Sequence, residues 1–303
     1  MKTAWMFPGQ GSQYVGMSKD LAEQSPVVRQ MFDEGDRILG TPLSSIMFEG
    51  PEEELRQTRN TQPAIFTHSM VLVRLLGNKR PDMVAGHSLG EYSALVAAGA
   101  LTFADALRLV RLRGELMQRA GKSEPGTMAA IVGLQANVVE EACVAAQSAG
   151  VVQPANFNSP GQIVISGSVE GVRAAMAIAK ERGAKLVKEL VVSGAFHSPL
   201  MQSAAKEFRE ALDGASIIDA SIPVYANVTA EPVTKAGQIR ELLFQQLTAP
   251  VRWEASVVNM VRDGATSFVE IGPGKVLQGL VKRIESSVTT SGIDKHADLP
   301  GTA

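Results

Sequence analysis

The sequence predicts an α/β fold in which a large domain with a mostly parallel sheet carries a smaller inserted unit. Over most of the chain, short apolar runs alternate with segments of helical spacing, which is typical of parallel strands covered by helices. In the middle of the chain the order changes to strand, helix, strand, strand, helix, strand. This order is typical of a compact ferredoxin-like unit that can be inserted into a larger domain.

Length and composition exclude several classes of protein. A chain of 303 residues is long enough for two domains, and 45% hydrophobic with 20% charged residues is near the average for globular proteins. The net charge of -2 provides no general basic field, so no nucleic-acid partner is expected. The apolar runs are too short for a signal-peptide core or a membrane span, so no membrane partner is expected. The single cysteine, Cys143, cannot form an internal disulfide and favours a cytoplasmic location.

In the first part of the chain, predicted strands alternate with predicted helices. We expect strands at residues 3–7 and 83–85, and helices at residues 17–39 (interrupted at Pro26), 63–76 and 105–120. The first strand runs into the turn PGQGSQ, and the second runs into GHSLG. Pro125 and Gly126 end the last helical pattern, so we place a domain boundary at Ser123.

The rest of the chain completes both predicted domains. The insert is expected to have strands at residues 128–134, 151–157, 162–166 and 185–192, and helices at 137–149 and 169–182. The large domain then resumes with helices at 199–212, 240–247 and 253–263, strands at 223–226 and 267–271, and a last helix after GPGKVL. The predicted domains are therefore residues 1–122 with 198–303, and the inserted residues 123–197. We expect the polar tail from Ser286 to be loosely held.

The pentapeptide GHSLG, residues 86–90, matches the pattern G-x-S-x-G between a short apolar strand and a helix rich in small residues. In this context the turn is a nucleophile elbow, which lifts a serine hydroxyl off the backbone at the end of a strand. The two glycines remove Cβ atoms that would clash where the chain folds sharply. The motif predicts Ser88 as a nucleophile in an α/β-hydrolase-like large domain, and a serine in an ordinary turn is the alternative.

A serine nucleophile needs a base, and the chain has four histidines. The side chain of His87 is expected to point away from Ser88, because the two residues are adjacent. His68 lies on a predicted helix and His296 lies in the polar tail. His197 follows the last strand of the insert, where the chain returns to the large domain. We therefore expect His197 to be the base, with a structural role as the alternative.

The predicted helix at residues 105–120 carries a charge on its apolar side. Its apolar stripe is formed by Ala106, Leu109, Val110, Leu116 and Met117. Arg113 lies on the same stripe. Burying a guanidinium group is costly unless it meets an anion, so Arg113 pairs either with an internal carboxylate or with a carboxylate of a ligand.

Seven short motifs follow one another along the chain. They are FPGQGSQ at residues 7–13, GHSLGEYSAL at 86–95, RLRGELMQ at 111–118, NSPGQIVISG at 158–167, GAFHSPLM at 194–201, QLTAPVRW at 246–253 and EIGPGKVL at 270–277. Together they resemble the malonyl-CoA:acyl carrier protein transacylases of bacterial fatty acid synthesis. The resemblance runs from about Thr3 to Ile284.

The resemblance implies roles for the residues that match the motifs. The serine of GHSLG takes the acyl group, which corresponds to Ser88, and the histidine of AFHS is its base, which corresponds to His197. The arginine of the RG pair, which corresponds to Arg113, binds the malonyl carboxylate. This agrees with one of the two partners expected for Arg113 from its place on the apolar stripe, a carboxylate of a ligand. The glutamine of QLTAPVRW, Gln246, supports the histidine ring.

The resemblance also implies residues that surround the reacting atoms. The backbone N–H groups of Gln10 and Leu89 form the oxyanion hole, and Gln62 and Asn158 line the cleft between the domains. We also expect Met117 to contact the substrate. No metal or bound cofactor is implied, and GPGKVL lacks the spacing of a phosphate-binding loop.

The implied activity is transfer of a malonyl group from malonyl-CoA to the phosphopantetheine thiol of acyl carrier protein, through an acyl-enzyme on Ser88. Phe196, beside the base, is expected to fill the space next to the acyl α-carbon. Related acyltransferases that accept methylmalonyl groups carry a smaller residue at this position. A preference for malonyl groups is therefore expected.

The expected partners are malonyl-CoA and, transiently, acyl carrier protein, and the protein is expected to be a monomer. Because carrier proteins are acidic, a local basic patch is expected despite the negative net charge. Its candidate residues are Lys180, Arg182, Lys185, Lys188, Lys275, Lys282 and Arg283.

Three alternatives remain open from the sequence. The first is a free-standing acyltransferase that loads polyketide synthase carriers, which differs in pathway but not in chemistry. The second is a serine hydrolase, which is disfavoured because an ordinary esterase has no use for a buried arginine that binds a free acid. The third is a scaffold that only binds carrier protein, which is disfavoured because nucleophile, base and arginine are all present.

Overall fold

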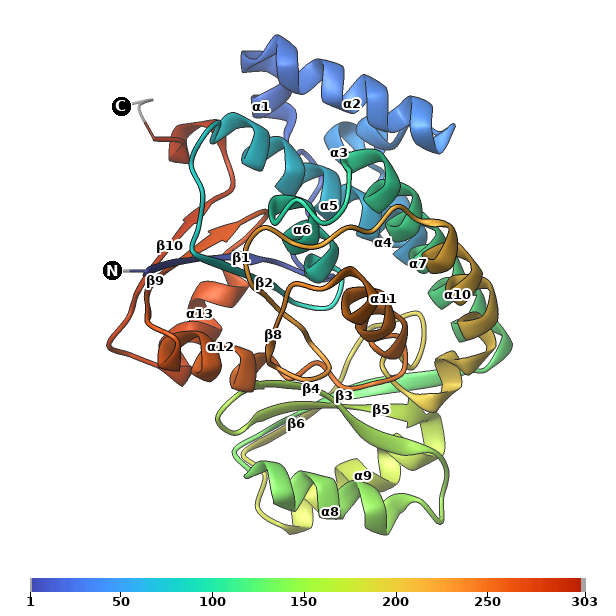
Figure 1. The fold of residues 1–303 in the computed structure, drawn as a ribbon. Helices are drawn as coiled ribbons and strands as arrows, with labels where there is room; N and C mark the ends of the chain where they lie inside the picture. Colours follow the sequence, from blue (N-terminus) through green and yellow to red (C-terminus); the bar gives the residue numbers. More distant parts are fainter. Residues whose placement is uncertain (1, 301–303) are drawn as a thin grey trace.

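The computed structural model describes residues 2–300, and two β-sheets organise them (Figure 1). Within this range the larger sheet has the strand order β10-β9-β1-β2-β7-β8. Its strands are β1 (Lys2–Phe7), β2 (Met83–Gly86), β7 (Val224–Tyr225), β8 (Pro232–Val233), β9 (Ala265–Ile271) and β10 (Thr289–Ile293). Every neighbouring pair is parallel except β7 with β8, so the predicted largely parallel sheet is confirmed.

Helices cover both faces of the larger sheet (Figure 1). They are α1 (Lys19–Gln24), α2 (Pro26–Leu39), α3 (Leu43–Glu49), α4 (Glu52–Arg56), α5 (Thr58–Leu75), α6 (Gly90–Ala97), α7 (Phe103–Ser123), α10 (Ala205–Gly214), α11 (Ala236–Gln245), α12 (Trp253–Arg262) and α13 (Val276–Ile284), with 3-10 turns η1 (Pro199–Ala204) and η2 (His296–Asp298). Successive residues of β1 pack into different cores, because side chains alternate across a strand. Trp5 and Phe7 join the core with α5 and α6, whereas Ala4 and Met6 join the core with α12 and α13.

The second sheet lies in the middle of the chain and has the order β4-β5-β3-β6, with antiparallel pairs throughout. Its elements are β3 (Gly126–Val132), α8 (Ala136–Ala146), β4 (Val152–Ser159), β5 (Gln162–Ser168), α9 (Val169–Glu181) and β6 (Leu186–Glu189). This is the predicted order of strands and helices. Helices α8 and α9 cover one face of the sheet, and the other face turns toward the larger part of the molecule (Figure 1).

The main chain of the larger part pairs directly with the second sheet. The backbone N–H of Phe157 on β4 donates to the carbonyl of Val251 at 2.9 Å, and the N–H of Val251 donates to the carbonyl of Ala155 at 2.8 Å. Residue 251 therefore lies along β4 as a short parallel bridge at Asn156. The second sheet is thus joined by backbone hydrogen bonds to the loop between α11 and α12.

Helix α5 begins five residues earlier than the sequence predicts. A proline usually marks a helix start, and Pro63 was expected to do so, yet α5 begins at Thr58 and continues through it. Because Pro63 has no N–H, the carbonyl of Arg59 one turn earlier loses its helical donor. The guanidinium of Arg111 on α7 donates to this carbonyl at 3.0 Å instead. A contact from a distant helix thus replaces the missing backbone hydrogen bond.

The prediction that the tail from Ser286 is loosely held is wrong. Residues 289–293 form β10, which pairs in parallel with β9 at the edge of the larger sheet. Asp294 follows and accepts hydrogen bonds from the Tyr14 hydroxyl at 2.9 Å and the Gly274 N–H at 3.2 Å. An edge strand of threonine and serine needs little apolar surface, so polarity was a poor guide to order here.

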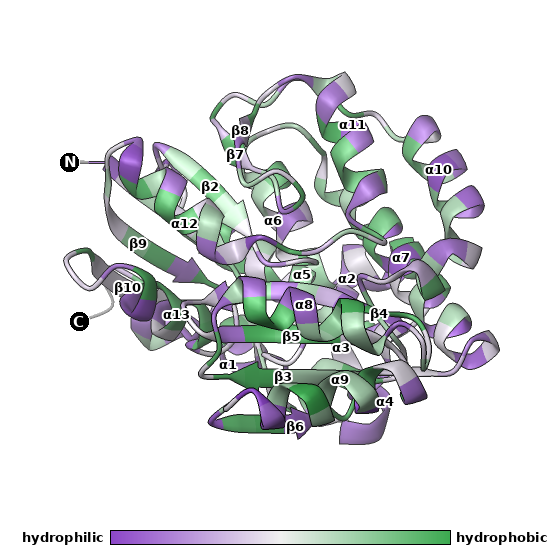
Figure 2. Ribbon diagram, turned by 90° about the horizontal axis from the view of Figure 1, so that it is seen from below, coloured by the Kyte–Doolittle hydropathy of each residue, from purple (hydrophilic) through white to green (hydrophobic). Residues whose placement is uncertain are grey.

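Hydropathy follows the layers of the fold. In Figure 2, strands such as β9 and β3 are coloured as hydrophobic, whereas surface helices such as α10 show hydrophilic and hydrophobic stripes. Within residues 2–300, no helix has both the length and the apolar composition needed to cross a membrane.

Candidate active site

Ser88 lies in the turn between β2 and α6, at the carboxyl end of a central strand of the larger sheet. Its φ is 51°, in the left-handed region that is costly for a residue with a side chain. A Cβ atom on Gly86 would lie 1.9 Å from the carbonyl carbon of Gly90, and one on Gly90 would lie 2.0 Å from the carbonyl oxygen of Phe7. Both flanking positions therefore require glycine, as the predicted elbow demands.

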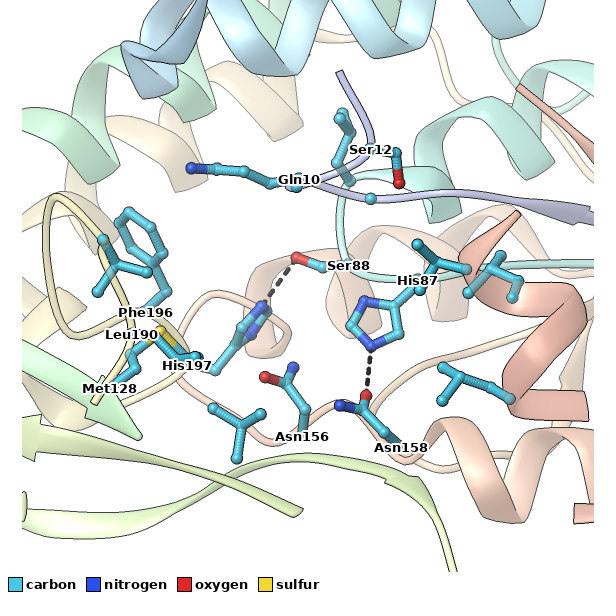
Figure 3. Close-up of a pocket in the computed structure, with 18 of the residues that line it drawn as sticks. Gln10, Ser12, His87, Ser88, Met128, Asn156, Asn158, Leu190, Phe196 and His197 are labelled. Atoms are coloured by element: carbon cyan, nitrogen blue, oxygen red, sulfur yellow. Dashed lines mark hydrogen bonds between the residues drawn. The ribbon is translucent and has the colours of Figure 1, made fainter. Parts of the chain in front are cut away.

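His197 lies within hydrogen-bonding distance of the serine, as predicted (Figure 3). Its Nε2 is 2.8 Å from Ser88 Oγ, and its Nδ1 is 2.9 Å from the carbonyl oxygen of Gln246 and 3.2 Å from that of Ala249. A carbonyl oxygen only accepts hydrogen bonds, so Nδ1 carries the hydrogen and Nε2 is free to accept one from Ser88. Gln246 thus orients the ring, but through its backbone rather than its side chain.

Burial keeps the His197 ring neutral. Its pKa is lowered from 6.5 to about 3, chiefly by burial and secondly by the positive charge of Arg113. A neutral imidazole can take up the serine proton at neutral pH, which is what a general base requires. The backbone of His197 has a φ of 56°, so the base, like the nucleophile, sits in a left-handed conformation.

Arg113 is buried at 1% exposure and donates only to neutral acceptors. Its Nη1 donates to Gln62 Oε1, and its Nη2 donates to Ser88 Oγ and to Gln246 Oε1, each at 2.9 Å. Its Nε has no partner, and among residues 2–300 it forms no ion pair within 4.0 Å. The internal ion pair considered from the sequence is therefore not formed, which favours a ligand anion.

The carboxamide of Gln246 is held by residues that the sequence reasoning missed. Its Nε2 donates to Glu91 Oε2 at 2.6 Å and to the carbonyl of Ser88 at 3.0 Å. Asn227 completes the network, since its Nδ2 donates to the carbonyl of Gly86 and its Oδ1 accepts from the Ser88 N–H, both at 2.7 Å. One signal for Glu91 was present, because it is the only charged residue in the otherwise small and apolar α6.

A cavity of about 320 Å³ opens beside Ser88, between the two sheets. Eight of the predicted residues line it: Gln10, Gln62, Ser88, Leu89, Met117, Asn158, Phe196 and His197. Arg113 and Gln246 lie behind the serine and complete its surroundings through hydrogen bonds. The structure therefore brings all ten predicted residues to one place.

Leu89 is the residue of the elbow that lines the cavity and whose N–H has no acceptor among residues 2–300. The N–H of Ser88 is engaged by Asn227, and the N–H of Gly90 by the carbonyl of His87 at 2.9 Å. Within the described chain no acceptor is found for the N–H of Leu89 or of Gln10. Two backbone donors beside the nucleophile are thus available to a ligand oxygen.

Two predictions about the cavity wall need refinement. The His87 ring is directed away from Ser88, as expected, but it still lines the cavity, where its Nε2 lies 2.9 Å from Asn158 Oδ1 (Figure 3). Gln62 bonds Arg113 through its oxygen, and its Nε2 contacts the Met117 sulfur at 3.3 Å. Gln62 therefore holds the Arg113 side chain, and Met117 in turn contacts Gln62.

The seven basic residues proposed for a patch are all exposed. Lys275 and Arg283 flank the part of α13 that lines the cavity, and Arg283 donates to the cavity residue Gln162 at 2.6 Å. Arg182 instead pairs with Glu141 at 2.8 Å, on the far side of the second sheet. Among residues 2–300, no group of three or more His, Cys, Asp or Glu could hold a metal ion.

The fold and this geometry define the class of the protein: an α/β protein in which a serine at a strand-to-helix elbow is hydrogen-bonded to a histidine and to a buried arginine. The family model described as the acyl transferase domain matches residues 4–297. The chain therefore belongs to the acyl transferase family, an enzyme family.

Relatives of known name cover nearly the whole chain. A malonyl CoA-acyl carrier protein transacylase of Bacillus subtilis (strain 168) is 50% identical over 292 residues, which are 95% of this chain and 92% of the relative. The protein of the same name from Escherichia coli (strain K12) is 46% identical over 299 residues, which are 98% of this chain and 97% of the relative.

Solved structures agree with these relatives. An acyl carrier protein S-malonyltransferase from Vibrio cholerae has a TM-score of 0.96 and 44% identity, with 100% of both chains covered. A malonyl-transacylase solved in complex with a type II polyketide synthase acyl carrier protein has a TM-score of 0.95 and 43% identity, covering 98% of this chain and 97% of that one.

We predict that the His197 ring stays neutral in the folded protein at pH 5, because its pKa is about 3 instead of 6.5. The unfolded chain binds this proton near pH 6.5, so the contribution of His197 to stability is complete above that pH and is lost as the pH falls toward 3. Nitrogen-15 nuclear magnetic resonance of the ring between pH 5 and 8 measures this, with His197→Gln to assign the signal. A ring that titrates near its ordinary value would contradict the buried network.

Proposed function

We propose that the protein transfers a malonyl group from malonyl-CoA to the phosphopantetheine thiol of acyl carrier protein. The observation that carries the proposal is the buried guanidinium of Arg113, which touches the nucleophile but has no anionic partner. A malonyl group ends in a free carboxylate, which is the anion that such a guanidinium binds in a bidentate manner. The names of the relatives point to the same acyl group.

In the proposed first half-reaction, Ser88 Oγ gives its proton to His197 Nε2 and attacks the thioester carbonyl carbon. The oxyanion accepts hydrogen bonds from the N–H groups of Gln10 and Leu89. The C–S bond then breaks, and the sulfur of CoA leaves with the proton that His197 holds. This leaves a malonyl ester on Ser88.

In the proposed second half-reaction, His197 accepts the proton of the phosphopantetheine thiol, and the sulfur attacks the ester carbonyl. Collapse of the second oxyanion returns the proton to Ser88 Oγ and releases malonyl-carrier protein. The acidic carrier is proposed to dock near the exposed Lys275 and Arg283, which flank the cavity-lining part of α13. The other five basic candidates stay predictions.

We infer that residues 123–197 are an inserted ferredoxin-like domain, and residues 1–122 with 198–303 an α/β-hydrolase-like domain. The strand order β6-β3-β5-β4, with both helices on one face, supports the first description. The elbow at the end of a central parallel strand supports the second. The chain leaves the larger part after α7 and returns at η1, close to the proposed boundaries.

We further propose that the protein works as a cytoplasmic monomer in fatty acid synthesis, without a bound cofactor. The cavity is lined by residues of one chain, so no second copy is needed to complete it. Cys143 is buried, and burial raises its thiol pKa to about 12, so it does not compete as a nucleophile. One of the similar solved structures holds a malonyl-transacylase in complex with a type II polyketide synthase acyl carrier protein. Transfer to a polyketide carrier, by the same chemistry, is therefore a second candidate function.

We expect malonyl-CoA alone to leave a malonyl ester on Ser88, because the oxyanion donors and base stand ready before the carrier arrives. Mass spectrometry of the intact protein and of its peptides measures the adduct. Ser88→Ala should abolish it, and His197→Ala should slow its formation by about a thousandfold or more, as for loss of a general base acting with its nucleophile. An adduct on Cys143, or none in an active preparation, would refute the mechanism.

Arg113→Ala should depress malonyl transfer sharply while acetyl transfer is unchanged or improved. The reason is that the guanidinium holds only an acyl group with a carboxylate, and acetyl has none. Rates of ester formation with malonyl-CoA and acetyl-CoA give the ratio, and Arg119→Ala on the exposed side of α7 is the control. Equal losses for both acyl groups would return Arg113 to a structural role.

Phe196, which is 6% exposed and lines the cavity beside His197, is expected to exclude an α-methyl group. A single methyl changes binding in an apolar pocket enough to predict a preference for malonyl over methylmalonyl of roughly tenfold to two-hundredfold. Phe196→Ser should narrow this ratio, measured as transfer to one carrier protein. If the wild type shows no preference, or the ratio does not move, selectivity resides elsewhere in the cavity.

A further inference from the structure

Glu91 is a buried carboxylate that the proposed reaction does not use. It lies three residues after Ser88 on α6, and it is 2% exposed. Its Oε2 accepts from Gln246 Nε2 at 2.6 Å and from the N–H of Asn227 at 3.1 Å. Burying a carboxylate costs desolvation free energy, which two hydrogen bonds offset only in part. A buried carboxylate this close to Ser88 therefore suggests a role in the site.

The carboxamide of Gln246 connects Glu91 to Arg113. Its oxygen accepts from Arg113 Nη2 at 2.9 Å, while its nitrogen donates to Glu91 Oε2. An amide meets a cation only with its oxygen and an anion only with its nitrogen, so the two charges fix one orientation of this group. Two buried charges of opposite sign are therefore coupled through one neutral side chain.

We propose that Glu91 is a positioning residue that acts through Gln246 and sets how strongly Arg113 holds the carboxylate of an acyl substrate. The proposal rests on the proposed role of Arg113 in binding that carboxylate. When Glu91 is ionised, it partly neutralises the guanidinium, and the substrate carboxylate enters as a second anion. When Glu91 is protonated, Arg113 has no other counter-charge and holds the substrate carboxylate more tightly.

Both states of Glu91 occur near neutral pH. Burial raises its pKa to about 7, against the opposing hydrogen bond from Gln246 and the charge of Arg113 on α7. Burial favours the neutral forms of the other titratable groups nearby, since it raises the pKa of Tyr92, on the same helix, and lowers the pKa of His87 and His197. Arg113 and Glu91 are thus the charged pair that matters at this site.

The sign of the pH dependence follows from linkage. A carboxylate bound at Arg113 lies near Glu91 and raises its pKa, so malonyl binding takes up a proton there. Acetyl has no carboxylate and takes up none. The preference for malonyl over acetyl therefore falls as the pH rises from about 6 to about 8, by about fivefold if the coupling is at the lower end of the usual range.

The experiment measures ester formation from malonyl-CoA and from acetyl-CoA at pH 6, 7 and 8. Their ratio cancels the common pH dependence of the base. The wild-type ratio should fall with pH, whereas in Glu91→Gln, which keeps an acceptor oxygen of the same reach but no charge, it should be independent of pH and at least as high as in the wild type at pH 6. A Glu91→Gln ratio that falls like that of the wild type overturns the proposal.

Glu270→Gln is the matched control. Glu270 is also a fully buried carboxylate with a pKa raised by burial, but it accepts from Leu277 and Gln278 at the start of α13 and does not touch the arginine network. In Glu270→Gln, the ratio of malonyl to acetyl ester formation should follow that of the wild type at all three pH values. A ratio that is independent of pH in this control would mean that loss of any buried carboxylate removes the pH dependence, which also overturns the proposal.

A second measurement keeps the proposal testable if Glu91→Gln does not fold. Calorimetry of wild-type ester formation at pH 7, in two buffers of different ionisation enthalpy, counts protons. The malonyl reaction should take up a larger fraction of a proton than the acetyl reaction, and equal uptake contradicts the proposal. Failure of the proposed function would be distinguishable from failure of the proposal for Glu91. The former would show as no ester on wild-type Ser88, or as equal losses of malonyl and acetyl transfer in Arg113→Ala.

Discussion

The buried positive charge of Arg113 determines the arrangement of the site. Because no carboxylate contacts this guanidinium directly, its hydrogen bonds go to oriented dipoles, which Gln62, Gln246 and Ser88 provide. Burial lowers the pKa of His197, and the charge of Arg113 adds to this effect, so the imidazole ring stays neutral. Arg113 thus contacts Ser88 and the amide of Gln246 directly, and its charge adds to the effect of burial on His197.

The fold gathers these groups from distant parts of the chain. Ser88 comes from the end of β2 and Arg113 from α7, whereas His197 comes from the segment where the chain leaves the second sheet. Ser88 and His197 both have left-handed backbones, and such strain persists only when surrounding contacts fix it. For His197 the carbonyl groups of residues 246 and 249 are among those contacts, so the loop after α11 is part of the site.

Residues that a motif or an apolar stripe marks were predictable from sequence, and residues marked only by contacts with distant parts of the chain were less so. Ser88 was recognisable by its glycines and its strand-turn-helix context, and Arg113 by its place on an apolar stripe. The ring of His197 is held by carbonyl groups, which every residue has, so no residue type marks that contact. Glu91 and Asn227 were missed because their partners lie far away in sequence. The edge strand β10 was missed because pairing, not hydropathy, orders it.

The backbone bridge between β4 and residue 251 also bears on solubility. A sheet of antiparallel strands exposes unpaired N–H and C=O groups at each edge, and such edges recruit strands from other molecules. The bridge occupies the middle of the β4 edge with the chain's own backbone. At the opposite edge, β6 is only four residues long and carries Lys188 and Glu189, which discourages pairing by shortness and charge. Both edge strands of the second sheet are therefore protected from edge-to-edge aggregation, β4 by pairing with residue 251 and β6 by its short length and charged residues.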